Sequence, residues 1–457
     1  MLKTSSLSVP LLLLAGILLF ATPDQLFLIS PKTNAAAAPI AFRWSMRERF
    51  GKEGADGLVD YHWNSKTQTY AADYVNPTNW TVDFDACGTV PSPADLRWEI
   101  DGQQIPETTC SFSHDFTQLK SYVVSLTAVT PDGQSNTARA SVTLRDLLIV
   151  SIGDSFASGE GNPDKPRNAL KGPRWIDERC HRSRWAGPAT AAIVLEKANP
   201  QTSVTFISFA CTGASISEGL LGIQKRRGDK VQPQLDKVFE TVGRRTIDAL
   251  LISIGGNDLS FSTLVTKAVA LRHAEKNAEA KRLVDDGLRD LPNNLALVAQ
   301  RLSSSNNEAR IGAVFISEYP DIVRDETRDF CDHSVKLTDA LRGISDAESR
   351  WALNSVIIPL NNLIREQASH FGWNYVDGIL SEFGGDSANG IAHGFCADDK
   401  RWVNTFTDSW RIQGGGLGVN FERYRGTIHP NKEGHLWYAR RLVEELTANG
   451  VTGSVVP

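Results

Sequence analysis

The sequence has no excess of basic residues. Its 48 Lys and Arg are outnumbered by 53 Asp and Glu, which gives a formal net charge of −5. Nucleic-acid-binding domains usually carry a basic patch, so nothing here indicates a polyanionic partner. The chain also lacks internal repeats, and none of its cysteines forms a Cys-x-x-Cys pair, so the sequence gives little support to a zinc site or a thioredoxin-like motif.

The composition is otherwise that of an ordinary globular protein. The chain has 457 residues, of which 41% are hydrophobic and 22% are charged. This length is sufficient for more than one hydrophobic core.

The N-terminus has the pattern of an export signal. Lys3 supplies a positive charge, residues 9–20 form an apolar run, and the alanines at 35–38 offer small residues for cleavage. The apolar run is broken at residues 22–25, which disfavours a spanning helix. We therefore expect residues 1–38 to be a signal peptide or an N-terminal anchor, and the protein to be secreted or held in the cell envelope.

The six cysteines are Cys87, Cys110, Cys180, Cys211, Cys331 and Cys396. In an exported protein an even number of cysteines indicates disulfides, although the sequence alone does not choose among the connectivities. Our expectation is that neighbours in the sequence pair: Cys87 with Cys110, Cys180 with Cys211, and Cys331 with Cys396.

The pattern of predicted secondary structure changes near Arg145. Before it, β-branched or alternating runs at residues 80–84, 96–100, 122–129 and 138–144 are separated by turn signals. Short strands at this spacing predict a small all-β sandwich over residues 40–145. The strand and turn at 98–102 and those at 126–135 loosely resemble a PKD-type immunoglobulin-like module over residues 75–145.

After Arg145, strands and helices alternate. Apolar strand candidates lie at 147–152, 203–209, 249–254, 311–316 and 373–376, and helical patterns at 188–197, 231–242, 262–302 and 347–370 separate them. This alternation predicts a three-layer α/β/α, flavodoxin-like parallel sheet over residues 146–457. The charged, amphipathic stretch 262–302 is either a helical insertion covering one side of the site or a solvated helical pair.

Chemistry-bearing residues follow the predicted strands, where an open parallel sheet binds its ligands. Ser155 lies at a turn into a helix, where backbone N–H groups and the helix dipole favour negative charge. A serine nucleophile needs a base, and His429 is the type of residue that serves at neutral pH. The N–H groups of Ser155 and Gly213 and the side-chain amide of Asn257 are candidate donors for an oxyanion. Together these residues predict acyl transfer.

These segments resemble the SGNH (GDSL-type) hydrolase family over residues 146–445. In chain order the similar blocks are Gly153-Asp154-Ser155, Gly213, Gly256-Asn257-Asp258 and His429-Pro430. The surroundings of Cys180, Cys211 and Cys396 are similar to the secreted bacterial esterase and lipase branch, in which these cysteines are disulfide-bonded. The resemblance implies carboxylic ester hydrolysis. The serine mechanism needs no metal or organic cofactor, and we expect Asp154 to be structural, bonding backbone in its own turn.

One position departs from the family's pattern. An Asp usually stands three residues before the histidine, where it orients the imidazole, but here that residue is Gly426. We expect the backbone carbonyl of Gly426 to accept the Nδ1 proton of His429, giving a Ser-His dyad. Glu422 is the alternative partner.

Several motifs have a less specific explanation. The segment around Ser155 lacks Gly-x-Ser-x-Gly, which argues against an α/β-hydrolase nucleophile elbow. The glycines at 414–418 follow no strand and lack Gly-Lys-Ser/Thr, so a flexible rim loop explains them better than a phosphate loop. His181, His333 and His393 lie near cysteines, but no metal-ligand spacing recurs.

The sequence thus predicts a monomeric, exported serine esterase or lipase that acts on lipid or acylated glycan esters, with lipid esters slightly favoured. It is expected to contact a membrane surface or cell wall, and no nucleic acid. Two alternatives stay open: an envelope acyltransferase that uses the same serine, and a non-catalytic surface-binding protein in which the sandwich binds. The aromatic stretch around Trp402, Phe406 and Trp410 either lines an acyl pocket or belongs to the core.

Overall fold

The computed structural model describes residues 39–54, 57–59, 61–168, 170–261, 264, 274–304, 309–332, 344–386, 390–414 and 424–452. The expected export signal, His333 and Glu422 lie outside the described residues. Within those ranges, no helix has both the length and the apolar character needed to cross a membrane.

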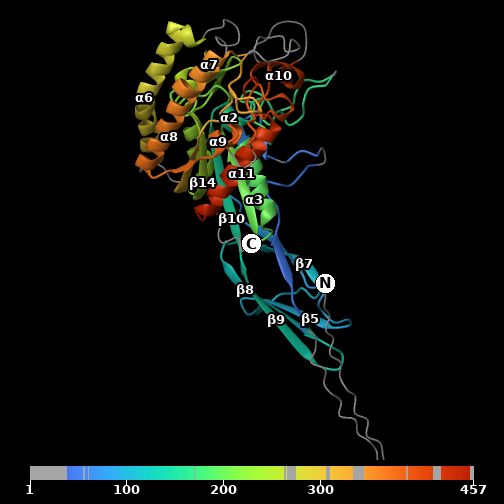
Figure 1. Cartoon of the computed structure of the whole chain (residues 1–457). Helices are drawn as coiled ribbons and strands as arrows, with labels where there is room; N and C mark the ends of the chain where they lie inside the picture. The colour runs from blue at the N-terminus through green and yellow to red at the C-terminus, as the bar shows by residue number, and fades with distance from the viewer. Residues whose placement is uncertain are drawn as a thin grey trace, which may run out of the picture. The chain divides into compact units, whose positions relative to one another are not determined.

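Two antiparallel sheets follow the N-terminus (Figure 1). One has the order β1-β4-β7, with β1 (Arg43–Met46), β4 (Trp80–Asp85) and β7 (Ser111–Phe116). The other has the order β6-β5-β8-β9, with β6 (Gln103–Gln104), β5 (Asp95–Ile100), β8 (Ser121–Val129) and β9 (Ser135–Thr143). Trp98, Phe84 and Leu126 are buried in the core that the two sheets share. This is the antiparallel β region predicted from the alternating sequence pattern.

The second half of the chain forms a five-stranded parallel sheet with the order β11-β10-β14-β15-β16. Its strands are β10 (Arg145–Gly153), β11 (Thr202–Ser208), β14 (Ile247–Ser253), β15 (Ile311–Ser317) and β16 (Asn374–Val376). If the five strands are numbered in chain order, their order across the sheet is 2-1-3-4-5. This is the flavodoxin-like order, which confirms the predicted fold class. Strand β10 reads as a continuous apolar run because helices cover both of its faces.

The flanking helices form two layers (Figure 1). Helices α3 (Gly187–Ala198), α9 (Ile379–Phe383) and α11 (Lys432–Ala448) lie in one layer, and α4 (Gln234–Val242), α6 (Ala278–Leu302) and α8 (Ile358–Phe371) in the other. The short helices are α1 (Ala72–Val75), α2 (Ser155–Ser158), α7 (Asp346–Trp351), α10 (Phe406–Gln413), η1 (Asn257–Leu259), η2 (Ala274–Lys276), η3 (Ala352–Ile357) and η4 (Asp398–Lys400). Two small hairpins pair β2 (Trp63–Asn64) with β3 (Thr69–Tyr70) and β12 (Gln224–Arg226) with β13 (Asp229–Val231).

Helix α6 is the crossover helix from β14 to β15 and is not a separate insertion. Leu291, Leu295 and Val298 on its inner face are wholly buried in the α/β core. The high charge of residues 262–302 suggested an insertion or a solvated pair. Over the described residues 278–302, that charge lies on the solvent side of an amphipathic helix whose other side packs on the sheet.

Residues 61–75 cover the edge strand β11 of the parallel sheet. The Tyr74 hydroxyl donates to the Phe206 carbonyl (3.0 Å) and accepts the Phe206 N–H (2.9 Å), and Tyr70 makes the same pair of bonds with Ser208 (3.0 and 2.8 Å). Free backbone groups on an edge strand invite pairing with another chain, and these hydroxyls occupy them. The segment packs in the α/β core, although it lies inside the range 40–145 expected to be sandwich.

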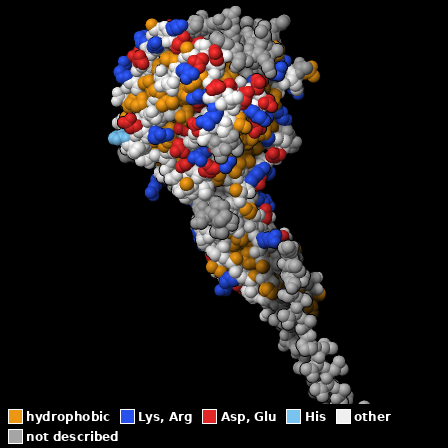
Figure 2. Space-filling model, in the orientation of Figure 1, with side chains coloured by type: hydrophobic (Ala, Val, Ile, Leu, Met, Phe, Trp, Pro, Cys, Tyr) orange, Lys and Arg blue, Asp and Glu red, His pale blue; other side chains and the backbone are white. Residues whose placement is uncertain are grey.

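The three disulfides pair Cys87 with Cys110, Cys180 with Cys211 and Cys331 with Cys396. The expected pairing of neighbours is confirmed. On the face of the molecule shown in Figure 2, acidic and basic side chains are interspersed over the α/β region.

Candidate active site

Ser155 and His429 meet at the carboxyl end of the sheet. The Ser155 Oγ and His429 Nε2 atoms are 2.7 Å apart, although 274 residues separate them in the sequence. Strand β10 ends at Gly153, which has a φ of 136° and on which a Cβ would lie 2.1 Å from the Ser253 carbonyl oxygen. Only glycine allows this turn, after which Ser155 begins α2. The geometry is that of a hydroxyl within reach of a base.

A backbone carbonyl orients His429, but it is not the expected one. The Nδ1 atom lies 3.1 Å from the Thr427 oxygen, whereas the Gly426 oxygen accepts the backbone N–H of His429 at 3.1 Å. The expectation for Gly426 is therefore wrong by one residue. Ile428, which stands between these two carbonyls and His429, has a φ of 66°, a left-handed conformation that turns the chain just before His429. With Nδ1 protonated toward Thr427, Nε2 is free to accept the Ser155 proton.

Packing explains why no Asp stands at position 426. A Cβ on Gly426 would lie 2.6 Å from the Gly161 Cα, 2.7 Å from Gln413 Oε1 and 3.0 Å from Ser409 Oγ. A side chain cannot fit there without moving backbone. Burial lowers the pKa of His429, so the imidazole is neutral and ready to act as a base near neutral pH.

The expected oxyanion donors lie on three segments that are hydrogen-bonded to one another: the start of α2, the Gly213 loop and the start of η1. Asn257 Nδ2 donates to the Ala214 carbonyl at 2.9 Å, which holds this amide beside Gly213. The N–H of Cys211 donates to the Gly153 carbonyl at 3.0 Å, which holds the Gly213 loop against the end of β10. Within the described chain, the backbone N–H groups of Ser155 and Gly213 have no hydrogen-bond acceptor. Such N–H groups suit an oxyanion.

Asp154 joins the first and third blocks of the site. Its Oδ1 caps α2 by accepting the Phe156 N–H at 3.0 Å, and its Oδ2 accepts the Tyr319 hydroxyl at 2.5 Å. The Tyr319 oxygen accepts the Gly256 N–H at 2.9 Å. Burial raises the pKa of Asp154 to about 7. These contacts support the structural role expected for this residue.

Gln234, which sequence reasoning missed, hydrogen-bonds the end of β10 just before Ser155. Its Oε1 accepts the Gly153 N–H at 2.7 Å and its Nε2 donates to the Gly153 carbonyl at 2.9 Å. In the sequence, Gln234 is indistinguishable from a surface glutamine of an amphipathic helix, and only the fold brings it to Gly153.

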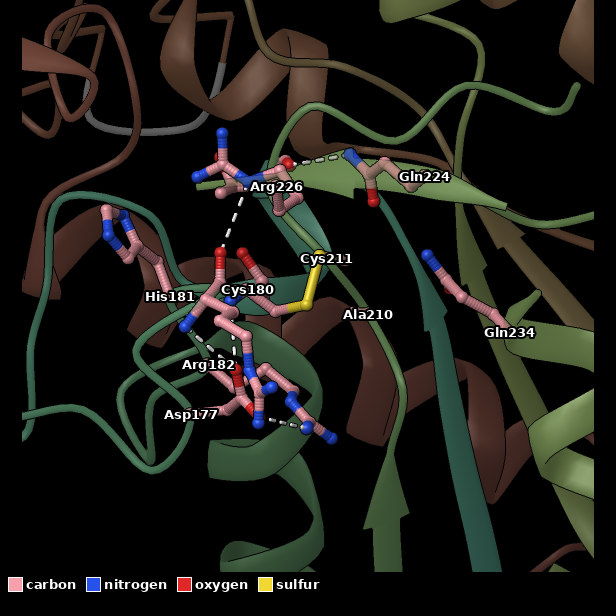
Figure 3. The surroundings of a disulfide bond; sticks show 12 residues. Asp177, Cys180, His181, Arg182, Ala210, Cys211, Gln224, Arg226 and Gln234 are labelled. Atoms are coloured by element: carbon pink, nitrogen blue, oxygen red, sulfur yellow. Dashed lines mark hydrogen bonds and ion pairs between the residues drawn. A yellow bond between two sulfur atoms is a disulfide. The ribbon is translucent and has the colours of Figure 1, made fainter. Parts of the chain in front are cut away.

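The Cys180–Cys211 disulfide ties a further loop to the site (Figure 3). The Thr212 N–H donates to the Cys180 carbonyl at 3.1 Å, and Gln224 Nε2 donates to the Thr212 carbonyl at 3.0 Å. Residue 213 therefore lies on a loop held from both sides. On the Cys180 side, Figure 3 also shows His181 and Arg182.

The histidines near cysteines have other partners. His181 Nδ1 is 2.7 Å from Glu160, and its ring stacks on Trp175. His393 Nδ1 is 2.6 Å from the Lys400 carbonyl, and its ring stacks on Trp402. The described residues contain no group of three or more His, Cys, Asp or Glu that could hold a metal ion.

An apolar cavity of about 60 Å³ lies near the dyad, although neither Ser155 nor His429 is part of its wall. Ile428, next to His429, and Phe261, whose ring centroid is 6.4 Å from that of His429, belong to its wall. The wide π-helical turn η3 contributes Ala352, Val356 and Ile357. Such turns are rare and occur often at functional sites.

The aromatic residues considered for an acyl pocket lie elsewhere. Trp402 is buried between His393 and Trp437, and Phe406 stacks on Tyr424. Trp410 is 44% exposed. None of the three is part of the cavity wall.

The chain is similar to several solved structures at low sequence identity. An extracellular lipase from Streptomyces rimosus has 21% identity and a TM-score of 0.43, covering 66% of this chain and 99% of that one. A phospholipase A1 from Streptomyces albidoflavus NA297 has 21% identity and a TM-score of 0.41, covering 66% and 98%. A carbohydrate esterase, described as having divergent catalytic and non-catalytic binding functions, has 14% identity and a TM-score of 0.30, covering 91% and 99%.

No curated protein matches the sequence. A family model does match it, over residues 151–437, which include Ser155, Gly213, Asn257 and His429. Because this match spans well over half of the chain, the protein belongs to the GDSL-like lipase/acylhydrolase family, a family of ester hydrolases.

Proposed function

We propose that the protein is an exported serine esterase that hydrolyses carboxylic esters with apolar acyl groups, a lipid ester being the favoured substrate. The observation that carries the proposal is the 2.7 Å contact between Ser155 Oγ and His429 Nε2, with an apolar cavity near it. His429 removes the hydroxyl proton as Ser155 Oγ attacks the ester carbonyl carbon.

Three donors hold the oxyanion that this attack creates: the N–H groups of Ser155 and Gly213 and the amide of Asn257. Collapse of the intermediate breaks the bond to the alcohol oxygen, which takes the proton from His429. Water then loses a proton to His429 and attacks the acyl-enzyme, which releases the acid and restores Ser155. The Thr427 carbonyl keeps the imidazole in the required tautomer.

The cavity supports an apolar acyl group over a sugar at this position. Apart from Glu348, its wall is formed by aliphatic and aromatic side chains such as Phe261, Trp351 and Ile428. We therefore infer that this cavity receives the apolar part of the acyl group.

Three disulfides support an oxidising location outside the cytosol. They agree with the export pattern of residues 1–38, and we propose that the mature enzyme acts in the cell envelope or the surrounding medium.

The test is release of p-nitrophenol from esters of two to sixteen carbons by the oxidised protein. Ser155→Ala should abolish turnover. Ser158→Ala is the matched control, because Ser158 is a buried serine on the same helix whose Oγ contacts only the Ser155 carbonyl, at 3.3 Å. Turnover by the wild type that survives in Ser155→Ala would refute the nucleophile.

Two other outcomes identify the alternatives. Ester formation with an added polyol, at the expense of hydrolysis, would indicate an acyltransferase. Absence of turnover at every chain length, with and without the polyol, would favour a binding protein.

A further inference from the structure

A buried carboxylate lies behind the turn that carries His429. Glu160 is 0% exposed and stands between Gly159 and Gly161, both of which have a positive φ. Its Oε2 is 2.7 Å from His181 Nδ1, and its Oε1 accepts a 2.6 Å hydrogen bond from Gln413 Nε2. A buried charge is destabilising unless it is paired and hydrogen-bonded, and both oxygens of Glu160 meet this condition.

Gln413 connects Glu160 to the His429 turn. Its Oε1 accepts the N–H of Gly426 at 3.0 Å, and the Gly426 oxygen accepts the backbone N–H of His429 at 3.1 Å. The two turns also touch directly, since a Cβ on Gly426 would lie only 2.6 Å from the Gly161 Cα. A continuous set of hydrogen bonds therefore leads from the carboxylate to the backbone of His429.

We propose that Glu160 is a positioning residue for His429 and supplies, from behind the turn, the negative charge that position 426 does not carry. It contacts neither the substrate nor Ser155 Oγ. It acts through Gln413 on the turn, and through space on the imidazolium that forms when His429 takes the serine proton. The inference rests on the proposed serine-esterase function.

The charges around His429 agree with this role. Burial lowers the pKa of His429; the Glu160 charge and the backbone hydrogen bonds of Thr427 and Arg425 oppose this effect, and the Arg425 charge adds to it. The nearby His435 of α11 is neutral, because burial lowers its pKa to about 3. Glu160 stays ionised: burial alone would raise its pKa, but His181 and the hydrogen bonds outweigh burial and hold it far below its ordinary value. Of the charged side chains named here, Glu160 is the one whose charge favours the His429 cation.

The test is the pH dependence of kcat and kcat/KM for Glu160→Gln on a soluble p-nitrophenyl ester. We expect kcat to fall roughly 10- to 100-fold, the range of a hydrogen bond to a charged group. We also expect the acidic limb of kcat/KM to move to lower pH, because His429 loses a charge that raises its pKa. A tenfold loss of imidazolium stabilisation corresponds to about one pH unit. A lower kcat with an unmoved limb would overturn the electrostatic role.

Companion variants separate charge from bonding. Glu160→Asp should keep the limb near its wild-type position and recover part of the rate. Gln413→Leu should lower kcat without moving the limb, since the charge remains. Glu318→Gln is the matched control, a buried glutamate that accepts the Tyr375 hydroxyl at 2.8 Å and the Leu380 N–H at 2.7 Å, and it should keep wild-type kinetics.

Failure to fold is detected by thermal unfolding. If Glu160→Gln does not fold, the kinetics of Glu160→Asp and Gln413→Leu test the proposal instead. Wild-type kinetics in Gln413→Leu would overturn the proposed connection between Glu160 and the His429 turn. An inactive wild type would instead sink the esterase function, which keeps the two failures distinct.

Discussion

Replacing Asn257 with alanine tests the oxyanion site more directly than any change to the dyad, because the Asn257 amide neither attacks the ester nor transfers a proton during the reaction. The side chain is fixed by its 2.9 Å bond to the Ala214 carbonyl, and one amide hydrogen is left for the substrate. Loss of a single preorganised donor lowers kcat roughly 10²- to 10³-fold, or about 2.7–4 kcal/mol in transition-state stabilisation. We expect a fall of this size on p-nitrophenyl butyrate, with KM little changed.

The structural cost of Asn257→Ala is small by comparison. The lost bond to Ala214 is worth about 1 kcal/mol of unfolding free energy, which urea denaturation measures separately. Asn294→Ala is the matched control: its amide donates at 3.4 Å to Asp258, next to Asn257 in the chain, and its kcat should equal the wild type's. A kcat within about threefold of wild type in Asn257→Ala would refute the donor role.

Three further predictions concern stability. Tyr74→Phe removes the hydroxyl partner of both the N–H and the C=O of Phe206 in β11, and Tyr70→Phe removes that of the Ser208 N–H, whereas Arg182 still donates to the Ser208 carbonyl. Urea denaturation should show a loss of about 1–3 kcal/mol per substitution. Replacing both Cys180 and Cys211 with alanine opens a loop with a sequence separation of 31 and should cost roughly 3–4 kcal/mol by the same assay. Burial lowers the pKa of His435 from 6.5 to about 3, so the stability contributed by its neutral form is complete above pH 6.5 and is lost as the pH falls toward 3. Between pH 6.5 and 3, the unfolding midpoint of His435→Gln should therefore fall less steeply than that of the wild type. A parallel fall in the two proteins would refute the low pKa.

The parts of the fold that the sequence predicted depend on local patterns. All five strands of the parallel sheet were expected within a few residues of their observed bounds, since buried strands read as short apolar runs. Helix α6 was misjudged because its solvent face, with residues such as Arg289 and Asp290, dominates its composition. Residues 61–75 were assigned to the sandwich because nothing local says which core Tyr70 and Tyr74 will join.

The site residues, like the fold, could be predicted where the signal is local in the sequence and not where it depends on contacts made on folding. Ser155 and His429 were expected to meet because each stands in a recognisable block. Gln234 and Glu160 act through contacts made only after folding, and Glu160 meets Gln413 across 253 residues. The choice of Thr427 over Gly426 accompanies a left-handed backbone conformation at Ile428, which a branched residue rarely adopts and which the sequence therefore did not suggest.

The missing Asp and the buried Glu160 are two consequences of one packing arrangement. Gly161 and Gly426 bring their backbones so close that neither position admits a side chain, which removes the usual place for a carboxylate beside His429. The same approach brings the turn containing Glu160 against the His429 turn, where Gln413 bonds to both. A neutral carbonyl at Thr427 can set the tautomer of the imidazole, but it offers a growing cation less stabilisation than a full negative charge. Because the two glycines are in close contact, the backbone carbonyl of Thr427 orients the His429 imidazole, and Glu160 supplies the negative charge that stabilises its cation.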